Sequence, residues 1–194
     1  MGKHGPVTAM RRAVFLDRDG VLNRAVVRDR KPYAPESLDD LEILPGVTWA
    51  LRMLHEAGFL LIVVTNQPEV ARGRVAQDVV EAMHRRLREE LPLDDIKVCY
   101  ETDSPASTCY KPKPGMLLDA AREHHIELAQ SYMVGDRWRD VGAGKAAGCF
   151  TIFIDRGYDE PSAEAPDAVC ADLTEATSLI LHATDRSPLL GKTR

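Results

Sequence analysis

The stretch Ala13-Val14-Phe15-Leu16-Asp17-Arg18-Asp19-Gly20-Val21-Leu22-Asn23 decides the expected fold of this chain. Its leading apolar residues, bounded by a turn, are typical of a strand buried on both faces of a parallel sheet. Asp17 would then end the strand, where open α/β sheets place their ligand crevice. Asp19 follows two residues later, and its carboxylate can face the same side because side chains alternate along an extended chain. The stretch therefore predicts a buried strand that leads into an acidic, ligand-binding turn.

A divalent cation is the expected occupant of this turn. Two crowded carboxylates repel each other unless a cation lies between them, and oxygen ligands favour Mg²⁺ over zinc. Gly20 lets the backbone turn sharply and approach a ligand closely. Taken by itself, the stretch has an alternative interpretation as a strand followed by a solvated acidic turn, so other parts of the chain must decide.

Strands and helices are predicted to alternate about five times along the chain. Apolar runs indicate further strands at 59–64, 96–100, 132–134, 149–154 and 168–170, and helical patterns occur at 44–57, 75–90, 115–125, 141–147 and 173–181. This order predicts an α/β protein with a three-layer α/β/α, Rossmann-like parallel sheet. We expect one domain over residues 12–182, with flexible tails at 1–11 and 183–194. Because the connections are short, no large cap domain is expected, and loops at 24–36 and 100–112 would cover the crevice.

Composition narrows the classes of function. The chain has 194 residues, of which 44% are hydrophobic and 28% are charged, as in ordinary globular domains. Its formal net charge of −5 argues against nucleic-acid binding, and no apolar stretch approaches the ~20 residues that span a membrane. Four cysteines in a chain of this length do not suggest a disulfide framework. A cytoplasmic location is therefore expected.

Four polar features fall just after predicted strands or at a helix N-terminus. They are Asp17 with Asp19, Thr65 with Asn66, Lys111 before the helix that Pro114 opens, and Asp136 with Asp140. Each alone has an ordinary structural explanation, namely a cap, a turn or a solvated charge. Their joint placement at one edge of a parallel sheet instead predicts a shared site.

These features resemble the motifs of the haloacid dehalogenase-like (HAD) hydrolases. The matching stretches are Phe15–Asn23, Val63–Gln67, Lys111–Met116, and Val134-Gly135-Asp136 with Asp140, and together they span about residues 12–155. The motifs Asp-Arg-Asp-Gly, Thr-Asn-Gln and Lys-Pro-x-Pro-Gly-Met resemble those of one branch of this family, the heptose bisphosphate phosphatases and histidinol phosphatases. The resemblance implies a HAD-like fold and a phosphatase activity.

The resemblance also implies a role for each motif residue. Mg²⁺ would be held by the carboxylates of Asp17 and Asp136 and by the backbone carbonyl of Asp19. Asp17 would attack phosphorus to give an aspartyl-phosphate, and Asp19 would act as general acid and then general base. Thr65 would bind phosphoryl oxygens, and Lys111 would neutralise charge in the transition state.

Asp140 has two interpretations that the sequence leaves open. It would orient Lys111 or a metal-bound water, or it would only cap the following helix.

Substrate contacts are less well defined by the sequence. The candidates are Arg28, Asn66, Gln67, Arg72, Arg74, Tyr110 and Arg137, and the loop residues Arg24, Arg30 and Lys31 add positive charge nearby. Tyr110 stands where the branch has an arginine, and a phenol cannot replace an arginine that binds a second phosphate bidentately. Trp138 would pack on a sugar ring or, alternatively, inside the fold.

A zinc site is not expected. The heptose bisphosphate phosphatases that this chain resembles commonly carry a four-ligand zinc loop of Cys-x-His followed by Cys-x-Cys. Cys99 and Cys109 match that pattern, but Glu101 and Ser107 replace the other two ligands. Two thiolates do not complete the tetrahedral set that structural zinc requires, so the cysteines are expected to be free, partly buried thiols.

The sequence thus predicts a Mg²⁺-dependent phosphatase of a small phosphomonoester such as a phosphosugar, with heptose 1,7-bisphosphate as one candidate. Histidinol phosphate is the alternative substrate. Two rival classes are a catalytically silent phospho-ligand-binding module and a phosphoacceptor domain that holds phosphate on Asp17. The expected partner is a small phosphorylated substrate, and the expected assembly is a monomer or weak dimer.

Overall fold

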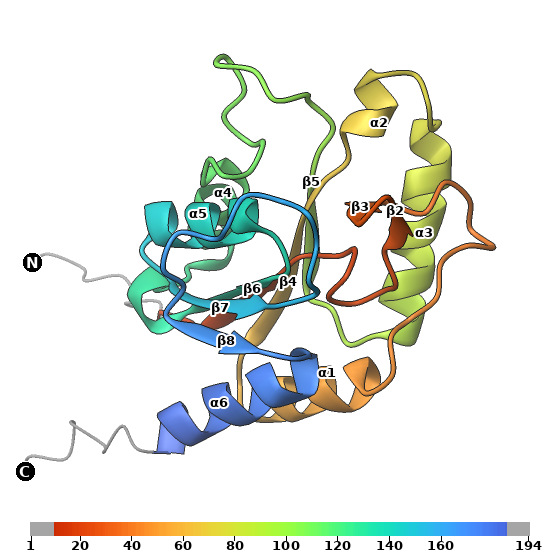
Figure 1. Ribbon diagram of the computed structural model, residues 1–194. Helices are drawn as coiled ribbons and strands as arrows, with labels where there is room; N and C mark the ends of the chain where they lie inside the picture. The colour runs from red at the N-terminus through yellow and green to blue at the C-terminus, as the bar shows by residue number, and fades with distance from the viewer. Residues whose placement is uncertain (1–9, 186–194) are drawn as a thin grey trace, which may run out of the picture.

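The computed structural model describes residues 10–185 and contains a six-stranded parallel sheet (Figure 1). Its strands are β1 (Ala13–Leu16), β4 (Leu60–Asn66), β5 (Asp95–Cys99), β6 (Tyr132–Gly135), β7 (Phe150–Ile154) and β8 (Ala168–Cys170). The strand order is β5-β4-β1-β6-β7-β8. The apolar run Ala13–Leu16 is therefore a central strand, and its four residues are completely buried.

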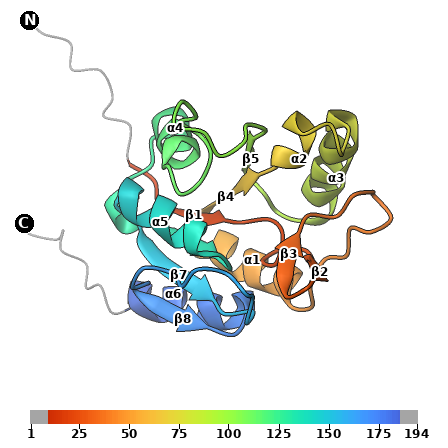
Figure 2. The ribbon, with the colours of Figure 1, turned by 45° about the horizontal axis from the view of Figure 1, so that its top comes forward.

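Helices cover both faces of the sheet (Figures 1 and 2). The first core packs α1 (Val47–Glu56), α3 (Gln77–Glu90) and α6 (Leu173–Asp185) against one face, and the second packs α4 (Gly115–His124) and α5 (Trp138–Ala147) against the other. Side chains of β1 alternate between them, with Val14 and Leu16 in the first core and Phe15 in the second. The predicted three-layer α/β/α fold is confirmed.

The chain reverses its direction of travel across the sheet at β1. From β1 it moves outward through β4 to β5, and it then returns to the other side of β1 to build β6, β7 and β8. Leu16 pairs with Val63 on one side and Val134 on the other, so the end of β1 lies beside the carboxyl-terminal parts of β4 and β6. The Asp17 amide extends this pairing by donating to the Val134 carbonyl at 2.9 Å. Ligand sites in open α/β sheets lie at such a reversal point.

The segment expected to be a loop after β1 contains an antiparallel hairpin. Strands β2 (Val26–Arg28) and β3 (Lys31–Tyr33) pair with each other and form a separate small sheet. Asp29 and Arg30 in their turn have φ values of 49° and 60°. Gly or Asn usually occupies such left-handed positions, so the sequence did not indicate a hairpin turn here. Pro32 lies within β3, and a proline in a short run argues against a strand, so the sequence pattern did not predict β3.

Two short helices were also not expected. These are α2 (Pro68–Ala71) and a 3₁₀ turn at Leu128–Gln130. Pro68 occupies the first helical position of α2, so α2 opens directly after β4 and brings its residues to the sheet edge.

The ordered chain extends slightly beyond residues 12–182 at both ends. The Arg11 amide donates to the His125 carbonyl, and α6 continues to Asp185. The rest of the two predicted tails lies outside the described residues. Within residues 10–185, no helix is long and apolar enough to cross a membrane.

Candidate active site

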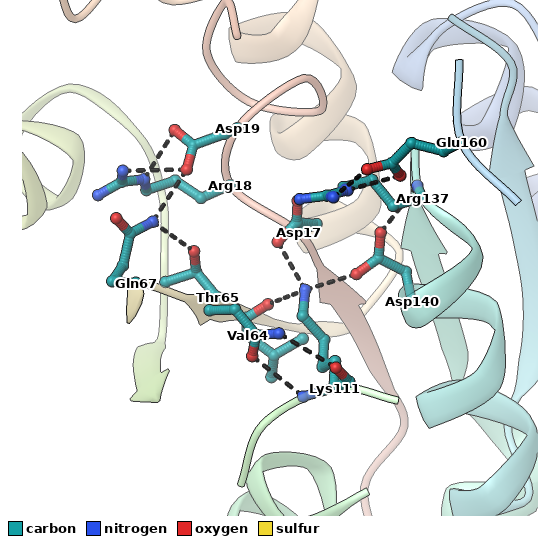
Figure 3. A network of polar contacts seen from close by, with 11 residues as sticks. Asp17, Arg18, Asp19, Val64, Thr65, Gln67, Lys111, Arg137, Asp140 and Glu160 are labelled. Atoms are coloured by element: carbon teal, nitrogen blue, oxygen red, sulfur yellow. Dashed lines mark hydrogen bonds and ion pairs between the residues drawn. The ribbon is translucent and has the colours of Figure 1, made fainter. Parts of the chain in front are cut away.

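Lys111 connects the main carboxylates of the site (Figure 3). Its ammonium lies 2.6 Å from Asp17 at the end of β1 and 2.5 Å from Asp140 in the first turn of α5. It also donates to the Val64 carbonyl of β4 at 2.8 Å. The ammonium is almost fully buried, so one lysine fixes the relative positions of three elements that are far apart in sequence.

The pKa values of this cluster reflect carboxylates crowded in a buried place. Burial raises the pKa of Asp17 to about 6; Lys111 opposes the rise, and the charge of Asp140 adds to it. Burial likewise raises the pKa of Asp136 well above its ordinary value, and Asp17 and Asp140 raise it further. Burial alone would lower the pKa of Lys111, but Asp140 and Asp17 outweigh it and raise that pKa. The cluster therefore has more negative charge than Lys111 alone can balance.

Asp136 is the carboxylate that most needs a cation. Both of its oxygens are buried and make no hydrogen bond of standard geometry within the described residues, and the nearby Tyr158 hydroxyl lowers the pKa of Asp136 less than burial and the neighbouring carboxylates raise it. Ligand oxygens of Asp17, Asp136 and Asp140 all lie within 4.8 Å of one another. An all-oxygen set with an unpartnered buried carboxylate suits Mg²⁺, so the residues present fit the predicted ion.

Gly20 is required for this arrangement. It adopts φ of 88°, and a Cβ atom at this position would lie 1.7 Å from a carboxylate oxygen of Asp136. Any side chain here would push the turn after β1 away from the end of β6. The glycine predicted from the turn thus permits a close approach to Asp136.

Asp140 combines the two roles that the sequence left open. One carboxylate oxygen accepts from Lys111, and the other accepts from the Arg137 amide at the start of α5 at 2.9 Å. The same side chain therefore caps a helix and orients the lysine.

Asp19 lies in a different environment. Its carboxylate accepts from Arg18 at 3.1 and 3.0 Å, from Asn23 at 2.9 Å and from Gln67 at 2.9 Å. These donors fix the position of both carboxylate oxygens. The predicted proton-transfer residue is thus held by its own clamp and not by Lys111.

The three polar residues at the end of β4 divide into separate roles. The Thr65 hydroxyl accepts from Gln67 at 2.9 Å, which leaves the hydroxyl proton available for another acceptor. Asn66 exchanges two hydrogen bonds with the backbone of Lys111, at 3.1 and 3.2 Å. Asn66 and Gln67 therefore position Lys111 and Asp19; Asn66 also lines the cleft, and the predicted substrate contacts of both residues stay predictions.

The cluster opens into a cleft of about 270 Å³. Thr65, Tyr110, Lys111 and the ends of β1 and α5 line it, together with the hairpin residues Pro32–Ala34 and the α2 region. The structure brings Arg72 and Arg137 to this cleft, but Glu69 pairs with Arg72 and Glu160 with Arg137. Arg28 is not among the lining residues and pairs with Glu36 on the exposed hairpin.

Comparison with known proteins assigns the family. A model of HAD-hydrolase-like proteins matches residues 108–176. The D-glycero-D-manno-heptose-1,7-bisphosphate 7-phosphatase of Thermosynechococcus vestitus is 35% identical and covers 88% of this chain and 95% of its own length. The corresponding enzyme of Escherichia coli K12 is 36% identical and covers 84% of this chain and 92% of its own length. The chain belongs to the HAD-like hydrolase family.

Solved structures of this family agree with the assignment. The crystal structure of a D,D-heptose 1,7-bisphosphate phosphatase from B. bronchiseptica, complexed with magnesium and phosphate, is 30% identical. It superposes with a TM-score of 0.76, covering 89% of this chain and 99% of that one. Since these HAD-like relatives are named phosphatases, the predicted enzyme class, a phosphoric monoester hydrolase, is confirmed at the level of the family.

Three residues of this HAD-like hydrolase contact the site although the sequence did not predict a role for them. Arg18 is completely buried and donates to Asp19 and to the ring of His84, at 3.1 Å from Nε2. Arg139 lines the cleft beside Tyr110. An arginine between two motif aspartates was a usable signal for Arg18. No sequence signal marked His84 or Arg139, because only the folded chain brings them to the site.

The cysteine loop differs from the expectation. Cys99 at the end of β5 and Cys109 form a disulfide, so they are not the free thiols that the sequence predicted. Ser107 lies 3.8 Å from the Cys109 sulfur, and its hydroxyl accepts from the Tyr110 amide. The bridge joins β5 to the segment that carries Lys111. The absence of zinc remains a prediction.

Proposed function

We propose that this protein is a Mg²⁺-dependent phosphatase that removes the 7-phosphate of D-glycero-D-manno-heptose 1,7-bisphosphate or of a closely related sugar bisphosphate. The observation that carries the proposal is the contact of the Lys111 ammonium with both Asp17 and Asp140 at the floor of a cleft. The names of the relatives over most of the chain support the choice of substrate.

The chemistry follows from the charges at the site. Asp17 and Asp136, with the backbone carbonyl of Asp19, would hold Mg²⁺, which supplies positive charge to the dianionic phosphate and to the attacking carboxylate. An Asp17 oxygen forms a bond to phosphorus while the bond from phosphorus to the sugar oxygen breaks. Lys111 stays hydrogen-bonded to Asp17 and stabilises the charge that spreads over the phosphoryl oxygens. The Thr65 hydroxyl donates a hydrogen bond to one of those oxygens.

Asp19 carries the proton in both half-reactions. It gives a proton to the leaving sugar oxygen, and it then accepts one from the water that attacks the phosphorus of phospho-Asp17. Water adds to phosphorus as the bond to Asp17 breaks, which releases phosphate and restores the carboxylate. The second step requires the carboxylate form, and the donors from Arg18, Asn23 and Gln67 hold its oxygens in place. The first step requires Asp19 to loosen part of this clamp and hold a proton.

The rival classes fit the site less well. A silent binding module would not need Asp17, Asp19 and Lys111 together. A phosphoacceptor domain would not need a residue that carries protons beside Asp17. Histidinol phosphate remains the alternative substrate and is decided by assay. A cytoplasmic location and a monomeric or weakly dimeric state also remain predictions.

A substrate panel tests the proposal. Phosphate release would be measured for heptose 1,7-bisphosphate, histidinol phosphate, hexose phosphates and nucleotides, with and without Mg²⁺. We expect the largest kcat/KM with heptose bisphosphate and no turnover after chelation. Rapid quenching followed by peptide mass analysis should locate a transient phosphate on Asp17. Full activity in EDTA, or a stable phosphoprotein without turnover, would exclude the mechanism.

A further inference from the structure

Arg139 occupies a defined place in the wall of the cleft. Its guanidinium carbon lies 4.4 Å from the centre of the Trp138 ring and 5.3 Å from the centre of the Tyr110 ring. Both distances are in the range of a cation–π contact. Nη1 also lies 3.5 Å from the Lys111 carbonyl. The two aromatic rings therefore hold the guanidinium beside the segment that carries the lysine.

Among the cations that line the cleft, Arg139 has the most exposed carboxylate partner. Lys111 is buried between carboxylates, Arg72 pairs with a Glu69 side chain that is 20% exposed, and Arg137 binds the Glu160 carboxylate. The carboxylate partner of Arg139 is Asp103, whose side chain is 58% exposed. Within the described residues, only Nη1 of Arg139 makes hydrogen bonds, so Nε and Nη2 have none.

The position of Arg139 suits an anionic group remote from the reacting phosphate. The Lys111 carbonyl lies beside Arg139, and the Lys111 ammonium touches Asp17. The guanidinium thus contacts the backbone end of the lysine whose ammonium contacts the nucleophile, and both residues line one cleft. An exposed ion pair such as Arg139–Asp103 contributes under about 1 kcal/mol, so a phosphate that binds bidentately can displace Asp103.

We propose that Arg139 binds the second phosphate of a sugar bisphosphate, with Tyr110 and Trp138 as the platform that fixes its guanidinium. This inference rests on the proposed function and adds its specificity residue. Tyr110 cannot bind a phosphate as an arginine would, but its ring places an arginine from α5 at the same wall. Arg139 therefore supplies the positive charge that is absent at position 110, where this chain has Tyr110 in place of an arginine.

Paired substrates test this assignment. Kinetics of Arg139→Ala would be measured with heptose 1,7-bisphosphate and with heptose 7-phosphate, which lacks the second phosphate. We expect the ratio of kcat/KM for bisphosphate over monophosphate to fall about 10- to 100-fold, mostly through KM, as expected for loss of charged hydrogen bonds. Asp103→Asn, which frees the guanidinium, should lower KM for the bisphosphate. Arg74→Ala removes an exposed arginine that does not line the cleft and should leave the ratio unchanged.

Several outcomes would overturn the assignment. One is an equal loss on both substrates, and another is a change of the ratio in Arg72→Ala but not in Arg139→Ala. A separate assay uses heptose 1,7-bisphosphate as an inhibitor of p-nitrophenyl phosphate hydrolysis. If the wild type does not hydrolyse the bisphosphate, the proposed function fails, but weaker inhibition in Arg139→Ala would still support the subsite. If the bisphosphate also does not inhibit the wild type, the subsite fails too.

Discussion

Asp17 and Asp19 are two residues apart in one turn, yet their surroundings are opposite. Asp17 is buried against two other carboxylates and shares a single ammonium with one of them. Asp19 accepts hydrogen bonds from three side chains and has no second carboxylate among those contacts. The first environment leaves an anion in need of a cation, and the second satisfies an anion completely. The same side chain is thereby prepared for attack on phosphorus at one position and for proton transfer at the other.

Removing the charge of Asp17 should have the largest effect on this contrast. Asp17→Asn deletes the nucleophile, so we expect kcat to fall by roughly 10⁴ or more, in the range of other nucleophile deletions. The measurement is phosphate release under saturating substrate and Mg²⁺. A fall of less than about tenfold would be incompatible with covalent catalysis by Asp17.

The same variant should be more stable than the wild type in metal-free buffer. Burial raises the pKa of Asp17 to about 6, although Lys111 opposes the rise. Because an unfolded aspartate titrates near about 3.9, the ionised carboxyl costs stability increasingly from about pH 4 to pH 6 and fully above it. Asn carries no charge, so unfolding at pH 8 in EDTA should require up to about 3 kcal/mol more free energy. Added Mg²⁺ should raise Tm of the wild type more than that of the variant.

The Asp17 side of this contrast was predictable because it depends on where strands end. Asp17, Thr65 and Asp136 follow apolar runs, and parallel strands bring their carboxyl ends to one edge. Lys111 reached the same edge because the segment before α4 leads to it.

The remainder depends on contacts that the sequence does not encode locally. The β2–β3 hairpin turns through Asp29 and Arg30 without a glycine, and its fold directs Arg28 to Glu36. Arg139 is placed by aromatic rings, one of which comes from a distant loop. The Cys99–Cys109 bridge was missed because cysteine counting assumes that disulfides come in frameworks.

A smaller effect is expected on the Asp19 side of the contrast. Gln67→Leu removes one donor from Asp19 and one from Thr65, while the other donors remain. We expect kcat to fall about 10-fold, equivalent to about 1.4 kcal/mol, with little change in KM. Gln67→Glu keeps the size of the side chain but places a second anion beside Asp19, so its loss should be larger. Equal activities of the two variants would show that the hydrogen bond from the Gln67 amide to Asp19 does not contribute to catalysis.

The smallest effect on activity is expected from substitution of His84, which contacts Arg18 and not Asp19 itself. Arginine has no acceptor, so the His84 Nε2 must accept from Arg18, and the ring is therefore neutral with its proton on Nδ1. Burial, followed by the charge of Arg18, lowers the pKa of His84 to about 4. A protonated His84 ring would place two cations side by side. Its charge would also compete with Arg18 for the negative charge of Asp19.

This neutrality makes a prediction about stability and pH. An unfolded histidine takes up a proton below about pH 6.5, but folded His84 does so only near pH 4. The stabilising effect of its neutral form is therefore complete above pH 6.5 and is lost as pH falls toward 4, by up to about 3 kcal/mol. His84→Gln retains an oxygen that accepts from Arg18 and cannot titrate, so its unfolding free energy should fall less between pH 7 and pH 4.5. His55→Gln changes an exposed residue of α1, so its unfolding free energy should depend on pH as that of the wild type does. If the unfolding free energy of His84→Gln also followed the wild type, the site around Arg18 would tolerate a charged His84 ring.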